Sequence, residues 1–440
     1  MSIPTFTGLS TTLSGLEISQ AEIDTTGENI SNANTAGYTE QVVNTSEAAE
    51  DQIGGVQDDS GAPTDLGTGV DIDSITRSRD SFLDVQYRAQ NSITSAANTT
   101  SQELQDVQTA VGTSSTSGLQ SDLSSFWNAW SSLSTDPTNA AAQADVINAG
   151  QNVVSDFNSL STQMNTVMSQ AQEQYNELTG SNGEVQQDAQ QIASLNAQIV
   201  QANQSGQTDN TLLDQRDNLL DQLSSLAQVS VTDQSNGSVT VNFGDASQPL
   251  VGGTTGSTVT WPQTMTSNAG GQLGSLLSLA SSTGPIGQEL SSLDGVANDV
   301  ISSVNALQPS SPFFSGTSAA TIAVSATAST IQATSSGSTT TGDLAQSIGE
   351  LSGGTADQAY ATFVDQIGNG VQSAENNATT QQAVLTGISN QRQSVSGVSL
   401  DQEMTNLINF QQAYEASARV MNTIQSTISD LINTVGGAGI

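Results

Sequence analysis

Two heptad ladders near the ends of this 440-residue chain constrain its fold more than any other feature. The first places Phe6, Leu9, Leu13, Leu16, Gln20, Ile23, Gly27 and Ile30 at alternating steps of three and four. The second links Leu400, Met404, Leu407, Gln411, Tyr414, Ala418, Met421, Gln425, Ile428, Ile432 and Val435 in the same way. This spacing puts the side chains on one stripe of a helix, as at the seam of a coiled coil. Each ladder therefore needs a partner to cover it.

That partner lies either in the same chain or in another molecule. An ordinary intramolecular helix pair would hold a monomer together, and this alternative stays open. Assembly between subunits is favoured because Gly8, Gly15 and Gly27 each weaken an unpaired helix by about 1 kcal/mol relative to alanine. The second ladder, from Leu400 to Val435, would also form a helix ~54 Å long, too long to pack on one small domain. We therefore predict that the ladder residues form an assembly seam.

The charge of the chain restricts its partners. Six basic residues, all arginine, oppose 43 acidic ones, so the formal net charge is -37. Such a charge repels phosphate backbones and anionic lipid surfaces, which argues against binding to nucleic acid or membrane. The simplest interpretation of the acidity is that the surface charge keeps the chain soluble. A sharper hypothesis is that the protein works in an acidic medium, where partial protonation of the carboxylates would reduce their mutual repulsion. There is no cysteine, no Sec-type signal peptide and no apolar run of ~18 residues.

The pattern along the chain predicts a mainly α fold with a smaller β part. Val229–Thr232 and Ser238–Phe243 flank Asn236-Gly237, which is typical of a β-hairpin. Long terminal helices would form a coiled coil, and the rest of the chain would form a helical bundle domain with a small β domain inserted. We expect seven segments: a coiled-coil helix and turn (1–37), a helical body with short strands (38–228), a β-hairpin or β domain (229–281), a long helix (282–308), a Ser/Thr-rich strand or loop segment (309–343), a second helical part of the body (344–396) and a C-terminal coiled-coil helix (397–440).

A search for catalytic residues gives no candidate. Without histidine or cysteine, the familiar Ser-His and Cys-His nucleophile pairs cannot form. The acidic pairs Asp71/Asp73, Asp214/Asp217 and Asp401/Glu403 are interpreted as a strand patch, solvated helix faces or first-turn charges. We therefore expect no catalytic residue, no metal ligand and no cofactor, and a protein that is not an enzyme.

The turn after the first ladder carries a family resemblance. The segment Asn29–Thr39 resembles the N-terminal signature of flagellar rod, hook and hook-associated proteins, through Asn32, Ala33, Asn34, Thr35, Gly37 and Tyr38. Ala36 stands where that family normally has proline, and Glu40 where it often has arginine. Three further stretches are similar to the family of hook-associated protein 1: residues 213–223, Phe126–Trp130 leading to Asp136-Pro137, and residues 396–419.

The resemblance implies a structural subunit of the bacterial flagellum at the junction between hook and filament. It implies export through the flagellar type III apparatus and a ring of subunits whose termini form an inner coiled-coil layer. It also implies as partners other copies of the chain, the hook protein, the second junction protein and a cytoplasmic export chaperone. The alternatives are another axial protein (hook subunit or flagellin), a secreted adhesin suggested by the Ser/Thr-rich stretch, and a degradative enzyme carried on the axis.

Overall fold

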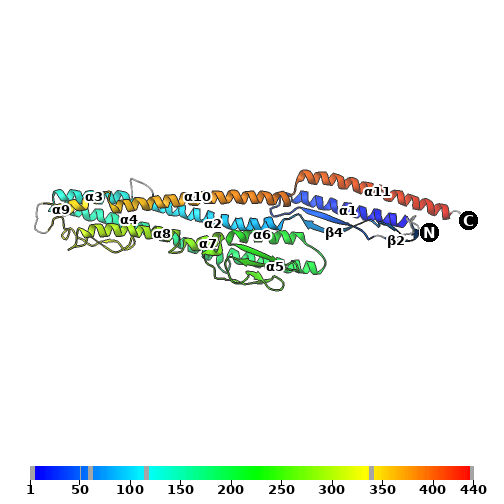
Figure 1. Ribbon diagram of the computed structural model, residues 1–440, viewed down its shortest axis with the longest axis horizontal. Helices are drawn as coiled ribbons and strands as arrows, with labels where there is room; N and C mark the ends of the chain where they lie inside the picture. Colours follow the sequence, from blue (N-terminus) through cyan, green and yellow to red (C-terminus); the bar gives the residue numbers. More distant parts are fainter. Residues whose placement is uncertain (1–4, 50, 58–62, 113–117, 336–340, 437–440) are drawn as a thin grey trace.

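The chain forms an elongated molecule with both termini at the same end (Figure 1). The computed structural model describes residues 5–49, 51–57, 63–112, 118–335 and 341–436. We call the part that carries the termini the terminal rod and the rest the body. No helix in these ranges is long and apolar enough to cross a membrane.

The terminal rod contains the two terminal helices and four strands. Helix α1 (Thr5–Asn32) packs antiparallel to helix α11 (Leu400–Gly436). Strand β1 (Gln41–Glu47) pairs antiparallel with β4 (Val70–Arg77), while β2 (Asp51–Gln57) pairs with β3 (Pro63–Leu66). The alternation of Val70, Ile72 and Ile75 with polar residues predicted the strand that becomes β4. Both β1 and β4 pack against α1.

The body is built around two long neighbouring helices, α2 (Ser81–Val111) and α10 (Thr355–Ser396). Helices α3 (Leu119–Thr135), α4 (Ala140–Thr179), α8 (Pro285–Ala306) and α9 (Asp343–Gly349) pack around their far end. The core there is aromatic, because Phe126 lies 5.4 Å between ring centroids from both Phe313 and Phe314. The two phenylalanines belong to the Ser/Thr-rich segment, in which β9 (Phe314–Ser315) pairs with β10 (Ala323–Val324).

A small sheet packs on the helical hairpin α5 (Glu184–Gln204) and α6 (Asn210–Leu226). Its four strands follow in chain order: β5 (Val229–Asp233), β6 (Val239–Phe243), β7 (Val251–Gly252) and β8 (Thr258–Val259). The hairpin predicted at Asn236-Gly237 is confirmed, since β5 pairs antiparallel with β6 and Gly237 has φ +88°.

The segment expected to be β structure up to residue 281 also contains helical turns. A 3-10 turn, η1 (Ser267–Ala269), precedes helix α7 (Gly271–Leu279). Leu273, Leu276 and Leu279 stand three residues apart on α7 and are all buried, which explains why this stretch is helical. The overall expectation of a mainly α fold with small sheets and long terminal helices is confirmed.

Two carboxyl groups of the body lie in helix contacts without a basic partner. Burial raises the pKa of Asp156 on α4 to about 6, and the charge and hydrogen bond of Asp122 on α3 act in the same direction. Burial likewise raises the pKa of Asp188 on α5 to about 6, with a further rise from Glu184. In the unfolded chain an aspartate has a pKa of ~3.9. The stabilisation from the neutral carboxyls is therefore complete below pH ~4 and is lost as the pH rises through about 6.

We predict that the chain is more resistant to heat at pH 5 than at pH 7.5, and that Asp156→Asn reduces this difference. The asparagine keeps the shape of the neutral carboxyl and cannot ionise. About half of the decrease in thermal stability that the two carboxyl groups cause between pH 5 and pH 7.5 should therefore disappear. The measurement is the midpoint of thermal unfolding across this pH range. Asp145→Asn, at an exposed position of the same helix, is the matched control. A wild-type midpoint that rises with pH over this range would contradict the prediction.

Candidate functional site

The terminal rod meets the body where the chain crosses between them three times. The crossings are residues 33–40 after α1, residues 78–80 between β4 and α2, and residues 397–399 between α10 and α11. The backbone N–H of Glu40 donates to the carbonyl of Ser396 (2.9 Å), and the N–H of Ser78 donates to the carbonyl of Glu40 (2.8 Å). The Ser78 hydroxyl donates to the carbonyl of Val395 (2.9 Å). Hydrogen bonds thus join the first two crossings to each other and to the end of α10, next to the third crossing, and we call this region the joint.

The turn after α1 anchors the first crossing. The N–H of Thr35 donates to the carbonyl of Asn32 (2.8 Å), and Gly37 takes φ +81°, which glycine adopts without strain. The hydroxyl of Tyr38 donates to Oδ1 of Asn29 (2.8 Å). Burial raises the pKa of Tyr38 to about 12, as do the charges of nearby carboxylates, so this phenol stays protonated and remains a donor.

The residues of the turn motif differ in exposure. Asn32, Ala33 and Tyr38 are half-buried, and Asn34, Thr35 and Gly37 are exposed. The next residue, Thr39, is buried, and its hydroxyl donates to Oδ1 of Asp214 on α6 (2.8 Å). Thr39 was not among the predicted site residues, although it fixes the turn to the body.

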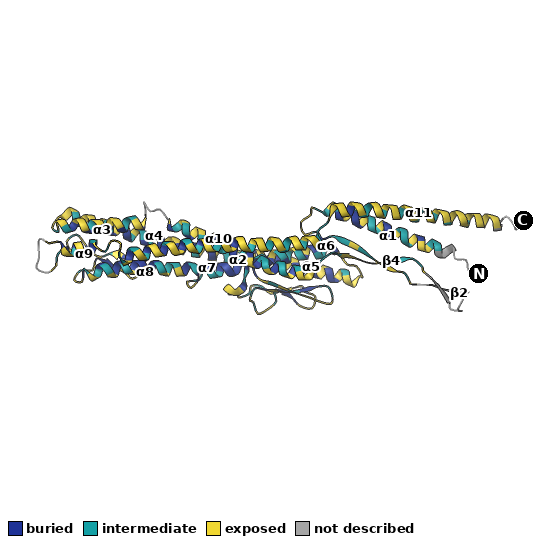
Figure 2. Cartoon of the chain, turned by 45° about the horizontal axis from the view of Figure 1, so that its top comes forward, coloured by how far each residue is buried: buried dark blue, intermediate teal, exposed yellow. Residues whose placement is uncertain are grey.

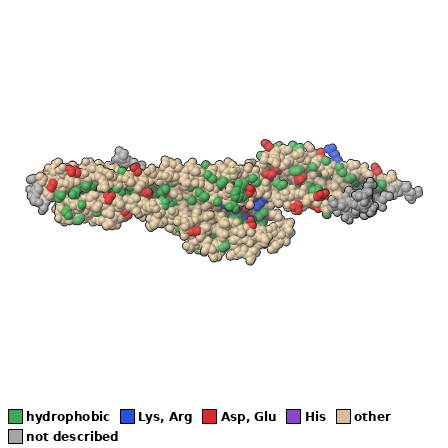
Figure 3. All heavy atoms as spheres, viewed as in Figure 1, with side chains coloured by type: hydrophobic (Ala, Val, Ile, Leu, Met, Phe, Trp, Pro, Cys, Tyr) green, Lys and Arg blue, Asp and Glu red, His purple; other side chains and the backbone are tan. Residues whose placement is uncertain are grey.

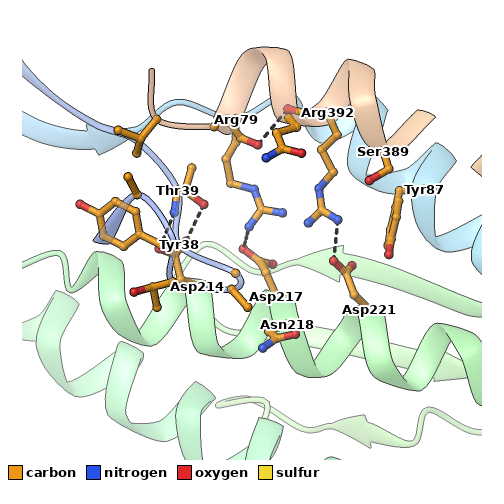
Figure 4. A pocket seen from close by; sticks show the side chains of 18 of the residues that line it. Tyr38, Thr39, Arg79, Tyr87, Asp214, Asp217, Asn218, Asp221, Ser389 and Arg392 are labelled. Carbon is orange, nitrogen blue, oxygen red and sulfur yellow. Dashed lines mark hydrogen bonds and ion pairs between the residues drawn. The ribbon is translucent and has the colours of Figure 1, made fainter. Parts of the chain in front are cut away.

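An ion-pair cluster fills the centre of the joint (Figure 4). Four arginines surround four aspartates: Arg77, Arg79, Arg88 and Arg392 with Asp84, Asp214, Asp217 and Asp221. Nη1 of Arg77 lies 2.7 Å from Oδ1 of Asp214 and 2.8 Å from Oδ2 of Asp217. Arg392 pairs with Asp221 (2.6 Å) and Asp84 (2.7 Å), and its guanidinium stacks over the ring of Tyr87.

Asp217 is the most highly connected member of the cluster. It pairs with Arg77, with Arg79 and with Arg88 (3.3 Å). Burial by itself raises the pKa of Asp217, but the three guanidinium charges outweigh burial and lower that pKa below its ordinary value. The carboxylate therefore stays ionised to low pH. It links β4 and the β4–α2 crossing to helices α2 and α6.

The expectation that Asp214 and Asp217 form a solvated helix face is wrong. Asp214 is buried and Asp217 is largely covered, because arginines from β4, α2 and α10 reach over α6. A signal for this was present in the sequence: Asp214, Asp217 and Asp221 stand three and four residues apart, so one helix face carries a row of carboxylates. Like charges in a row repel unless basic groups lie close to them. The chain has six arginines, and Arg77, Arg79 and Arg88 stand close together in the sequence, so they were candidates to pair with this row.

A polar cavity of about 500 Å³ lies under the turn in the joint. Its lining includes residues 33–39, the α6 carboxylates and residues 396–398. This cavity is therefore faced by three of the stretches that resemble flagellar proteins: residues 29–39, 213–223 and 396–419. Neighbouring stretches begin about 180 residues apart along the chain. The carboxylates of the cluster are paired with guanidinium groups, so ion pairs hold this wall of the cavity together.

The terminal helices contact each other through small and polar positions of α1. A Cβ added at Gly8 would lie 3.6 Å from Cδ1 of Ile424, and one at Gly15 would lie 3.5 Å from Oγ of Ser417. Two heptads after Gly15, Nδ2 of Asn29 donates to Oε2 of Glu403 (3.0 Å). Glu403 lies in the first turn of α11, as one of the two expectations had it, but it does not lie on a solvated face. It is buried, because α1 and β1 close over the start of α11.

The predicted ladder residues are divided between this contact and the surface beside it. On α1, Leu13 is exposed and the others are half-buried: Leu9, Leu16, Ile23 and Ile30. On α11 the half-buried members are Leu407, Tyr414, Ala418, Met421 and Ile428, whereas Leu400, Met404, Gln411, Gln425 and Ile432 are exposed. The side chains of Phe6 and Val435 lie outside the described residues. Sequence reasoning missed Gly8, Gly15 and Asn29, because a row of small and polar residues has no apolar signature.

Comparison with known proteins gives matches along most of the chain. A family model for the flagellar hook-associated protein FlgK helical domain matches residues 104–322. Models for the flagellar basal body rod FlgEFG protein C-terminal region and for the flagella basal body rod protein match residues 389–434 and 9–39. These two ranges cover most of α11 and most of α1, and the second includes the turn.

Similar proteins carry one name. Flagellar hook-associated protein 1 of Bacillus subtilis (strain 168) is 29% identical over 510 residues, which cover 99% of both chains. The protein of that name from Escherichia coli (strain K12) is 28% identical over 55% of this chain and 42% of its own length. The solved structure of the flagellar hook junction protein FlgK from Burkholderia pseudomallei has a TM-score of 0.43 and 24% identity, over 52% of this chain and 44% of that one.

We predict that Asp217→Asn lowers the free energy of unfolding by about 3 kcal/mol, since removing one partner leaves buried guanidinium groups incompletely paired. Hydrogen exchange of residues 33–40 and 396–399 should also become faster, because these crossings lose their anchor. Urea unfolding and exchange mass spectrometry measure the two effects. Asp365→Asn, at an exposed position on α10, is the control and should change neither. Exchange at the crossings that is unchanged in Asp217→Asn would show that the cluster does not hold the joint.

Proposed function

Because this chain belongs to the family of flagellar hook-associated protein 1 and is a structural subunit of the hook–filament junction, we propose that it joins its neighbours through one apolar face shared by its terminal helices. The observation that carries the proposal is the position of the two ladders. Leu13 on α1 and Leu400, Met404 and Ile432 on α11 are exposed beside the contact between α1 and α11, whereas other ladder residues of α11 are half-buried in it: Leu407, Tyr414, Met421 and Ile428.

The geometry follows from a shift of one residue in each helix. On α1 the contact positions 8, 15 and 29 are each followed by a ladder residue: Leu9, Leu16 and Ile30. On α11 the contact positions 403, 417 and 424 are likewise followed by Met404, Ala418 and Gln425. One residue turns a helix by about 100°. In antiparallel helices this turn brings both side chains to the same side of the pair. Leu9, Leu16 and Ile30 therefore lie on the same side as Met404 and Ala418, and we call this side the apolar face.

This apolar face is open in the single chain. Leu13 is 46% exposed, and Leu400 and Met404 are 45% and 58% exposed. The strands pack elsewhere on α1, because the N–H of Val70 on β4 donates to Oγ of Ser14 (3.3 Å). Figure 2 shows that much of α11 is exposed along its length. A row of exposed apolar side chains at heptad spacing fits another helix of the same kind.

The partners proposed for this face are other copies of the chain in a ring. Its neighbours in the flagellum would be the hook protein on one side and the second junction protein on the other. A cytoplasmic export chaperone would cover the ladder of α11 before export. The family is structural, and we propose that the chain has no catalytic activity.

We predict that Leu13→Gln combined with Met404→Gln prevents incorporation into flagella while the isolated chain stays folded. Covering a leucine or methionine is worth about 2 kcal/mol, so each loss weakens a contact between subunits more than tenfold. Complementation of a strain that lacks its own copy, scored by swimming and by filaments attached to hooks, measures the effect.

Val384→Gln, at an apolar position of α10 that is 44% exposed, is the control and should swim normally. Circular dichroism and hydrogen exchange of the purified double variant should match those of the wild type. Full restoration of motility by the double variant would contradict the proposal.

A further inference from the structure

Helix α2 carries a mostly apolar stripe on its solvent side, beginning next to the joint. At 100° per residue, six of its positions fall within a sector of about 80°. Phe82 is 65% exposed, Val85 62% and Ile93 51%. We call the whole set the α2 stripe: Phe82, Val85, Ala89, Ile93, Ala96 and Thr100. A contiguous row of exposed apolar side chains marks a contact surface, because a soluble chain gains nothing from leaving it in water.

The α2 stripe runs into a groove between α2 and α7, with a volume of about 490 Å³. Four residues of the stripe, from Ala89 to Thr100, line the groove on the side of α2. The wall at α7 is made of small residues: Ser267, Gly270, Gly271, Gly274, Ser275 and Ser278. Oγ of Ser275 lies 2.7 Å from Oγ1 of Thr100, and this hydrogen bond joins the two helices. Glycine and serine take little space, so the groove has room for side chains that a partner inserts.

Neutral residues make up the groove and its surroundings. All residues that line it are uncharged, and so are residues 89–102 of α2 and residues 246–288, which include β7, β8, η1 and α7. On the face shown in Figure 3, hydrophobic side chains gather on the body beside the joint, and acidic ones are scattered. The net charge of -37 drives copies of the chain apart wherever their carboxylates meet. At a neutral groove, two copies approach without this repulsion.

Other sides of α2 are occupied within the chain. Arg88 is buried and pairs with Asp221 on α6 (3.0 Å). Thr94 is also buried, and its Oγ1 donates to the carbonyl of Gln381 on α10 (3.2 Å). Between these contacts, the stripe residues from Phe82 to Ile93 stay exposed. The described part of the chain thus leaves this side of α2 to another molecule.

The position of the stripe selects the kind of partner. Helix α2 follows the long axis of the molecule, so the stripe lies on a flank of the body and not at one of its ends (Figure 1). In a ring of elongated subunits that stand side by side, a flank meets the neighbouring copy. The proteins above and below the ring meet the ends instead. A surface on this flank therefore fits a second copy of the chain.

The size of the rod contact also calls for a contribution from the body. From Leu9 to Ile30 the apolar face is ~30 Å long, and a helix pair is ~20 Å wide, so the rod offers ~600 Å². A stable interface takes ~800 Å² from each partner. The α2 stripe adds a strip ~27 Å long and ~10 Å wide, which closes this gap.

We propose that the α2 stripe and its groove form a second contact between copies of this chain, filled by the body of the neighbouring copy in the ring. The inference rests on the ring proposed above. A ring needs a heterologous interface, so the stripe of one copy faces a different surface of the next. The rod contact joins the terminal helices of neighbouring copies, and the α2 contact holds their bodies side by side next to the joint.

The test places a photocrosslinker on the stripe of the full-length chain. Phe82→p-benzoylphenylalanine keeps an aromatic side chain and links to C–H groups within contact distance on irradiation. Flagella are isolated from cells in which this variant replaces the wild type, and are then irradiated. We expect an adduct with the mass of two chains, whose second attachment point lies within residues 81–396. The purified, unassembled variant at the same concentration is the control and should give at least tenfold less of this adduct.

Three results would overturn the proposal. They are an adduct with another protein only, an adduct attached to the terminal rod of the second chain, and the absence of any adduct in flagella that contain the variant.

A pair of polar substitutions covers the case in which the crosslinker prevents assembly. Phe82→Gln combined with Ile93→Gln removes the apolar contact, and the isolated chain should stay folded by circular dichroism because both side chains are exposed. We expect the amount of the chain in isolated flagella to fall at least tenfold. Val384→Gln, the control on α10, should leave this amount unchanged. A double variant present at the wild-type amount would show that the stripe is not a contact.

Failure of the α2 contact and failure of the rod contact give different results. If the apolar face of the rod is not an interface, Leu13→Gln with Met404→Gln restores motility while the adduct at Phe82 still forms. If the α2 stripe is free in the assembly, the adduct is absent and Phe82→Gln with Ile93→Gln assembles normally, whatever the rod variant does.

Discussion

One buried carboxylate, Asp217, connects the two parts of this molecule. It is bound by guanidinium groups from β4, from the crossing that follows β4 and from α2, while it belongs itself to α6. A buried ion pair adds little net stability over apolar packing, but a misplaced partner leaves an uncompensated charge. The cluster therefore selects one arrangement of rod and body. The backbone hydrogen bonds that link the first two crossings to each other and to the end of α10 support the same arrangement.

Local patterns were enough to predict most of the elements. The hairpin at Asn236-Gly237 and the long terminal helices follow from spacing and turn chemistry within a few residues. Helix α7 was missed because its three leucines follow a stretch rich in strand formers and turns. A signal of nine residues is too short to separate helix from strand by periodicity alone.

The joint could not be predicted in the same way, because its partners are far apart in the sequence. Arg77 and Asp217 are separated by 140 residues, and Arg392 and Asp221 by 171. The acidic row on α6 was visible and its spacing was informative, yet solvent is the usual environment of such a row. The contact face of α1 was hidden for a different reason. Gly8, Gly15 and Asn29 have the heptad spacing but no hydrophobicity, so the neighbouring apolar ladder was the stronger signal.

The placement of the arginines also decides how copies of this chain can attract one another. Five of the six lie in or next to the joint, and Arg419 is the remaining one, on the terminal rod beside Glu415. Copies that each carry a charge of -37 repel, and they have almost no basic groups with which to form ion pairs across an interface. Attraction between copies must then come from apolar burial and hydrogen bonds. Under the proposal made above, the exposed ladder side chains supply this attraction: Leu13 on α1 and Leu400, Met404 and Ile432 on α11.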